Sequence, residues 1–152
     1  MTVSDWVSVI EAAGVIGSIL FLYFEYRRQN KLARSQFFFE KEKDFKSSPK
    51  MQRIVHCIEE TPEELHDILV EDKYEYIGLF EHIAFALNSK VISKAAAFNF
   101  FGHYAIQCAD CDEFWSDLDR DSIYWSVFFR FVNEMRAFQK KVLKKGQIPL
   151  DL

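Results

Sequence analysis

The chain has 152 residues, of which 49% are hydrophobic, and a formal net charge of -4. Its length fits one domain of ordinary size beside a short additional segment. The acidic balance, concentrated between residues 59 and 75, argues against a nucleic-acid-binding surface there. The three cysteines are an odd number. In a cytoplasmic domain they predict reduced thiols rather than a disulfide framework.

Residues 6–24, WVSVIEAAGVIGSILFLYF, form an apolar run whose one ionisable side chain is Glu11. About 20 apolar residues at a rise of ~1.5 Å cross the hydrocarbon core of a bilayer, so the run predicts a single transmembrane helix. The alternative is a buried helix of a soluble protein, which typically has a shorter apolar run and a polar stripe. A secretory signal peptide fits poorly, because the cations follow the run instead of preceding it.

A basic cluster follows the apolar run immediately. Because Lys and Arg near a helix end stay on the cytoplasmic side, we expect the N-terminus outside and the body in the cytoplasm. The sequence thus predicts a single-pass protein of the bacterial inner membrane. Residues 1–30 would form the transmembrane anchor, and residues 31–152 would form a cytoplasmic helical bundle. The basic flank comprises Arg27, Arg28, Lys31 and Arg34.

Small and polar residues fall along one face of the predicted span. Glu11, Ser18 and Glu25 are spaced by seven, and positions 13/17 and 14/18 form small-xxx-small pairs that let helices approach closely. A carboxylate in a membrane usually faces a bundle interior or a water-filled path, although snorkelling would also relieve its cost. The pattern predicts a homo-oligomer, with a conducting pore as one outcome. The helix-contact or pore residues are Glu11, Gly14, Gly17, Ser18 and Glu25.

The remainder of the chain has the pattern of helices and no stretch that alternates like a strand. The first helix can continue unbroken to about Lys46. Apolar residues recur at helical spacing over 74–87, 94–108 and 125–142. Signals for helix starts stand at Ser48-Pro49, at Thr61-Pro62 with a capping-box Glu64, at Asp72, at Ser93, and at Asp121 or Ser122. We therefore predict an all-α chain: one N-terminal transmembrane helix continuing into a compact helical bundle.

Few residues of the body suggest chemistry. Cys108 and Cys111 have the spacing of zinc and redox sites, but a structural zinc needs two more ligands. Serine nucleophile elbows, phosphate-binding glycine loops and zinc-protease histidine pairs are missing. We expect no catalytic residue, no metal and no cofactor. Four polar residues among apolar neighbours could build a small polar core site, although such histidines are more often hydrogen-bonded core residues: Glu81, His82, Asn99 and His103.

The segment YEYIGLFEHIAFALNSKVISKAAAFNFFGHY, followed by Glu113-Phe114-Trp115 and IYWSVFFRFVNEM, resembles a poorly characterised bacterial family with an N-terminal membrane helix and a small helical domain. This organisation is similar to that of the membrane accessory proteins of RNA-targeting CRISPR systems, which have HEPN-like bodies. The resemblance implies a pore that strengthens antiviral defence. It also implies three partners: further copies of the chain, the lipid bilayer, and a defence-system protein or RNA-guided complex.

HEPN ribonucleases carry an arginine and a histidine four to six residues apart on a helix, and this chain departs from that pattern. Arg53 and His56 are too close together, and no arginine precedes His103 at the required spacing. RNA cleavage and direct nucleic-acid binding are therefore not expected. Three functions remain open: a pore, a membrane-anchored interaction module without a pore, and a HEPN-like enzyme built around His82 and His103.

Overall fold

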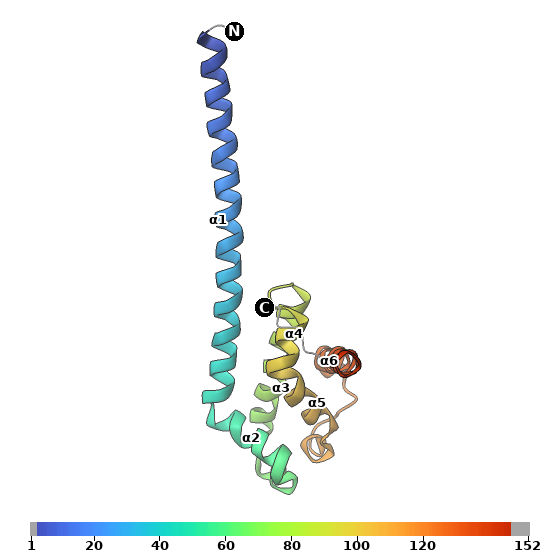
Figure 1. Ribbon diagram of the computed structural model, residues 1–152. Coiled ribbons are helices and arrows are strands. Elements are labelled where there is room, and N and C mark those ends of the chain that lie inside the picture. The colour runs from blue at the N-terminus through green and yellow to red at the C-terminus, as the bar shows by residue number, and fades with distance from the viewer. Residues whose placement is uncertain (1–2, 147–152) are drawn as a thin grey trace. The chain divides into compact units, whose positions relative to one another are not determined.

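The structure, a computed structural model, describes the backbone of residues 3–146. Residues 1–2 and 147–152 lie outside the described part, as do the side chains of residues 3–13, 30, 31 and 145. Every regular element in the described range is helical, which confirms the all-α prediction (Figure 1). The chain divides into two compact units, Met1–Phe37 and Phe38–Leu152.

The first helix, α1, runs without a break from Val3 to Ser47, as the unbroken sequence pattern predicted. Its last three turns belong to the second unit, where they supply two buried phenylalanines. The Phe38 ring meets Phe100 edge to face at 4.5 Å, and the Phe45 ring lies 5.0 Å from Tyr104. These aromatic contacts join the end of α1 to the core of the bundle.

Two of the expected caps begin helices. The Ser48 side chain accepts a hydrogen bond from the Met51 N–H and starts α2, Pro49–Glu60, with proline in the first turn. The Ser93 side chain accepts one from the Ala96 N–H and starts α4, Lys94–Ala97. Each serine oxygen thus supplies a hydrogen-bond acceptor for an N–H group of the first turn, which has no acceptor within the helix.

The expected α-helix start at Thr61 is wrong in detail. A short 3₁₀ helix, η1 (Pro62–Asp67), follows instead, and the Thr61 side chain makes no capping hydrogen bond. Only Leu65 of this segment is buried, while Glu63 and Glu64 stay exposed. Because only one apolar side chain of the segment is buried, packing against the core does not stabilise a longer amphipathic α-helix here.

The central helix, α3, spans Val70–Asn88 and begins two residues before Asp72, the predicted start. The predicted helix over 94–108 is a continuous helical segment of α4, a π-helical turn η2 (Phe98–Gly102), and α5 (His103–Asp110). At Gly102 an added Cβ would lie 2.8 Å from a Phe98 ring carbon and 3.3 Å from the Met135 sulfur. Glycine therefore permits this segment to pack closely against the last helix.

Two short 3₁₀ helices, η3 (Asp112–Trp115) and η4 (Ile123–Trp125), lead into the last helix, α6 (Ser126–Lys145). Ser122, one of the two expected starts, caps η4 through a hydrogen bond from the Tyr124 N–H. α6, seen nearly end-on in Figure 1, packs against α3 and α5. The largest fully buried rings of the core are Tyr76, Phe80, Phe101, Phe114, Phe128 and Phe131.

Candidate functional site

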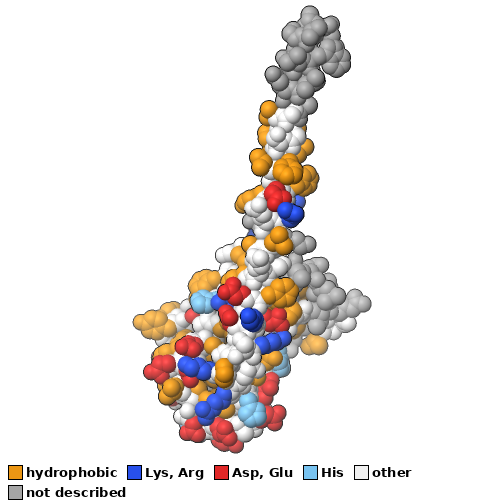
Figure 2. Space-filling view, turned by 90° about the vertical axis from the view of Figure 1, so that its left-hand side faces the viewer, with side chains coloured by type: hydrophobic (Ala, Val, Ile, Leu, Met, Phe, Trp, Pro, Cys, Tyr) orange, Lys and Arg blue, Asp and Glu red, His pale blue; other side chains and the backbone are white. Residues whose placement is uncertain are grey.

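An exposed apolar surface covers α1 between Val15 and Tyr26. Phe21 is 68% exposed, and its large hydrophobic neighbours are at least half exposed. Figure 2 shows hydrophobic side chains along the visible face of this part of the helix. Ile19, Leu20 and Phe21 are consecutive, so at about 100° per residue they point in three different directions. The apolar side chains therefore extend around most of the helix and leave one narrow face, which carries Gly14, Ser18 and Glu25.

The small residues predicted as helix contacts lie in open space. Apart from the nearby backbone of α1 itself, no atom of the described residues lies within 4 Å of a Cβ built on Gly14 or Gly17. The Ser18 hydroxyl donates a 2.9 Å hydrogen bond to the Gly14 carbonyl oxygen, so it is satisfied within its own helix. The Glu11 side chain lies outside the described residues.

The basic flank is exposed where its side chains are described. The Arg28 guanidinium lies 2.9 Å from the Glu25 carboxylate, one turn earlier, and the Arg27 guanidinium lies 5.8 Å from the centre of the Tyr23 ring. Arg34 is also exposed, and the Lys31 side chain lies outside the described part. The Glu25 carboxylate thus forms an ion pair with an arginine of the basic flank.

Among the residues that the structure describes, no helix is both long enough and apolar enough to cross a membrane. The predicted span begins at residue 6, and the side chains of its first eight residues lie outside the described part.

The predicted polar core site is not in the core. His82, Asn99 and His103 are exposed and Glu81 is half-buried. His82 falls on the solvent-facing stripe of α3, because the buried stripe includes its neighbours Phe80 and Ile83. Within the described residues no hydrogen bond or ion pair joins His82 to Asn99 or to His103. The histidines therefore belong to the surface.

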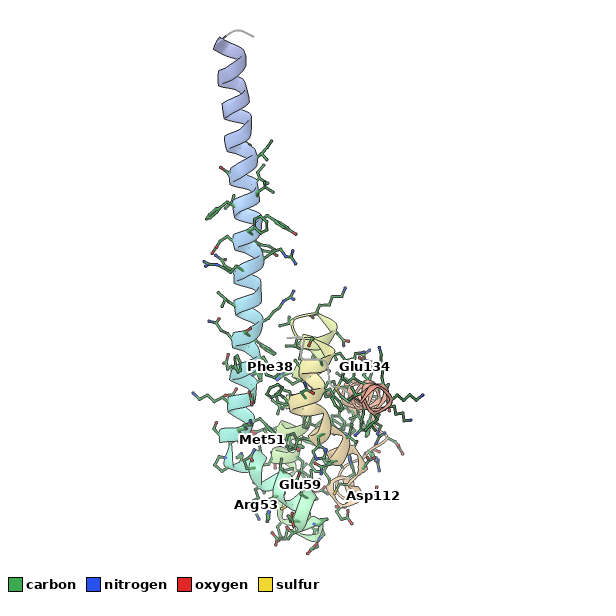
Figure 3. All side chains as sticks on the ribbon, in the orientation of Figure 1. Phe38, Met51, Arg53, Glu59, Asp112 and Glu134 are labelled. Carbon is green, nitrogen blue, oxygen red and sulfur yellow. The ribbon has the colours of Figure 1, made fainter. Side chains whose placement is uncertain are left out.

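Two of these residues have specific surroundings. Burial raises the pKa of the Glu81 carboxyl, and a hydrogen bond from the Phe128 backbone N–H together with the nearby His82 opposes that shift. The His103 imidazole Nε2 lies 4.0 Å from a carboxylate oxygen of Glu59, which is labelled on α2 in Figure 3. Both members of this pair face solvent, so the attraction is weak.

The structure reveals one buried charge that the sequence analysis missed. Lys73, in the first turns of α3, is completely buried, and its Nζ lies 2.6 Å from a carboxylate oxygen of Asp117. The ammonium also lies 5.5 Å from the centre of the Phe114 ring. Lys73 precedes Tyr76 and Ile77 by three and four residues, so the apolar stripe of α3 could have identified it.

Cys108 lies in the last turn of α5, and Cys111 follows that helix as its C-cap residue. Within the described part of the chain no group of three or more His, Cys, Asp or Glu could hold a metal ion. Burial raises the pKa of the Cys108 thiol well above its usual range. Burial also raises the pKa of Cys111; the Phe114 backbone N–H opposes this and the Glu113 carboxylate adds to it. Both thiols are therefore poor nucleophiles at neutral pH.

Comparison with known proteins identifies no relatives. No family model matches the chain, and no curated protein or solved structure matches it significantly.

Proposed function

We propose that α1 carries this protein into a lipid bilayer through residues 6–24, that copies of the chain associate there, and that the assembly perturbs the membrane. The observation that carries this proposal is the apolar surface of α1. The N-terminus would lie outside and the bundle in the cytoplasm, because the exposed arginines follow the apolar surface.

Free energy favours covering this surface. Removing a large apolar side chain from water contributes roughly 1.5 kcal/mol or more, so seven of them together amount to on the order of 10 kcal/mol. These seven are Val15, Ile16, Ile19, Leu20, Phe21, Leu22 and Phe24. One partner helix would cover a single face, whereas lipid covers all of them. Because these side chains extend around most of the helix, a bilayer covers more of them than one partner helix in a soluble dimer would.

Self-association within the bilayer is supported by the open face at Gly14 and Gly17. Small residues at the contact let two helices approach closely, and a polar group that the contact buries must keep a hydrogen-bond partner. The open glycines meet the first condition, and the hydrogen bond of Ser18 to Gly14 meets the second. A second copy could therefore pack on this face without a steric clash or an unpaired hydroxyl.

A pore is the specific form of this proposal that follows from the heptad spacing of Glu11, Ser18 and Glu25. In a ring of copies these side chains would line the lumen, and an acidic ring favours cations. The resemblance to CRISPR-linked membrane accessory proteins suggests that opening would serve antiviral defence. A membrane-anchored interaction module without a pore is the second candidate.

Membrane partition tests the proposal in its general form. The full-length chain should remain in the membrane fraction after an alkaline carbonate wash, and the Leu20→Lys/Phe21→Lys variant should leave it. The control is Leu143→Lys, which places a lysine at an exposed apolar position of α6, outside the predicted span. Recovery of the unaltered chain in the aqueous fraction, monodisperse without detergent, would overturn the proposal.

Ion flux tests the pore. Purified protein in liposomes should conduct cations, and Glu11→Lys should shift the selectivity toward anions. Unchanged selectivity would remove Glu11 from the lumen. Absence of flux from a membrane-inserted oligomer would favour the anchored interaction module.

A further inference from the structure

The bundle carries a second apolar surface, at the turn that precedes α6. Ile123 is 78% exposed and Tyr124 is 82% exposed. This turn is held in place: the Ser122 side chain accepts from the Tyr124 N–H, and the Trp125 indole N–H donates to the Asp119 carbonyl oxygen at 2.8 Å. The two side chains are thus presented outward by a fixed backbone.

Aromatic contacts connect this turn to α3 and to the core. The Tyr74 ring lies 5.5 Å from Trp125, and Trp125 lies 6.0 Å from the buried Trp115. Tyr74 is itself about half exposed. We name Tyr74, Ile123, Tyr124 and Trp125 the aromatic patch. Ring contacts and the indole hydrogen bond hold Tyr74 and Trp125 in place, and aromatic side chains, which have few rotatable bonds, lose little conformational entropy on binding.

Acidic residues border the aromatic patch. Asp119 and Asp121 immediately precede it and are exposed, and Glu71 is exposed one turn before Tyr74 on α3. Arg120, between the two aspartates, is engaged by the Asp112 carboxylate at 2.8 Å and by the Ala109 carbonyl oxygen. The patch therefore suits a partner that combines apolar and basic side chains.

The opposite end of α6 has that combination. Leu143 is 75% exposed, and Lys140, Lys141 and Lys144 around it are exposed. We name these four residues the basic end. Leu143 lies 17 positions after Ser126, which is next to the patch, and at ~1.5 Å per residue this is about 26 Å along one helix. The two surfaces are at opposite ends of α6 and cannot meet within one chain.

We propose that the basic end of one copy binds the aromatic patch of the next copy. Because two different surfaces meet, the contact is head-to-tail, and repetition closes a ring if the rotation permits or continues as a filament. This contact goes beyond the proposed function, since it lies in the bundle and uses no residue of the α1 face. It would determine how neighbouring bundles are oriented relative to one another in an assembly.

Site-specific cross-linking of the full-length chain in detergent tests the contact. Cys111→Ser removes the half-buried thiol, and Cys57 and Cys108 are buried. In that background Tyr124→Cys with Leu143→Cys should give a ladder of covalent multimers with a short bis-maleimide. A mixture of the two single variants should give dimers and no ladder, because each chain then has one reactive end.

A matched control moves one thiol along the same helix. Tyr124→Cys with Ala137→Cys carries the same number of exposed thiols, and it should give no ladder. A ladder of equal yield from this control would overturn the proposal, as would efficient dimers of Tyr124→Cys alone, which indicate a symmetric contact. A double variant that stays uncross-linked would also overturn it, because the patch then faces another protein or lipid.

Charge reversal supplies an independent readout. Asp119→Lys/Asp121→Lys should lower the cross-linking yield about 3- to 10-fold. It leaves the Asp119 carbonyl that holds Trp125 in place. Adding Lys140→Glu/Lys144→Glu to the same chain should restore the yield. An unchanged yield in the first variant, or no restoration in the second, would contradict the contact. Membrane retention should be unaffected throughout, which separates this test from that of α1.

Discussion

Lys73 and Asp117, 44 residues apart in the chain, form an ion pair at 2.6 Å in which the lysine is completely buried and the carboxylate is about one-third exposed. The pair ties the first turns of α3 to the segment that follows η3. The aromatic patch contains Tyr74, one residue after Lys73 on α3, and Trp125 of η4, the next element after the segment that holds Asp117. The ion pair therefore supports the geometry of that surface.

Removing the carboxylate should destabilise the bundle. Asp117→Asn would leave the Lys73 ammonium buried without a countercharge. We expect the free energy of unfolding to fall by about 2–3 kcal/mol. This lies at the low end of the loss typical of fully buried pairs, because the Asp117 carboxylate is about one-third exposed. Thermal or urea unfolding in one detergent, followed by circular dichroism, measures the change. Lys73→Met/Asp117→Ala should recover most of the loss. A double variant as unstable as Asp117→Asn would contradict this account of the pair.

Gly102 should be intolerant of a methyl group. Gly102→Ala places a Cβ 2.8 Å from a Phe98 ring carbon, so the ring must move, at a cost of about 1–3 kcal/mol. Gly78→Ala is the matched control, because nothing lies within 4 Å of its Cβ and α3 should gain about 0.5–1 kcal/mol. Opposite signs of the two changes in unfolding free energy are expected. Equal effects would show that the close contact at η2 carries no energetic weight.

The glycines of α1 should control self-association. Gly14→Leu and Gly17→Leu fit the single chain, since both positions are open, but they thicken the surface at which a second helix would approach. We expect a lower particle mass in detergent by light scattering. Ala33→Leu makes a similar enlargement beyond the predicted span and should leave the mass unchanged. If all three variants keep the parent mass, the copies meet elsewhere.

Thiol labelling should follow burial and charge. Cys111 should react with iodoacetamide at pH 8 more slowly than a free thiol, because burial and the Glu113 carboxylate raise its pKa. Labelling should accelerate as the pH rises and, in Glu113→Gln, should be a few-fold faster at pH 8. Cys108 should react only after unfolding, since it is fully buried. Mass spectrometry of labelled peptides locates the adduct, and rapid native-state labelling of Cys108 would contradict this.

The sequence predicted those parts of the fold that depend on local signals. The serine caps at residues 48 and 93, the long α1 and the apolar central helix all follow from spacing and capping chemistry. Thr61 carried the same signal, yet its segment became 3₁₀, because one buried leucine could not sustain an α-helix there. In this segment the small amount of apolar surface available for burial, and not the local capping signal, determined the type of helix.

The candidate sites depend on contacts between distant residues, which spacing alone does not determine. The Lys73–Asp117 pair joins segments 44 residues apart, and no sequence period indicates which carboxylate a buried lysine will meet. His82 and His103 had apolar neighbours in sequence, but their positions on the helices turn them toward solvent. The sequence did not predict the aromatic patch either, since Ile123 and Tyr124 are residue types that usually lie in a core, whereas here they are exposed.

The central claim, that α1 lies in a bilayer, is tested most directly by the accessibility of single thiols in intact membranes. With Cys111→Ser as background, Leu20→Cys should resist a membrane-impermeant maleimide, whereas Arg34→Cys should be labelled once the cytoplasmic side is opened. Labelling of both positions at the same rate in sealed or opened membranes would contradict insertion of α1.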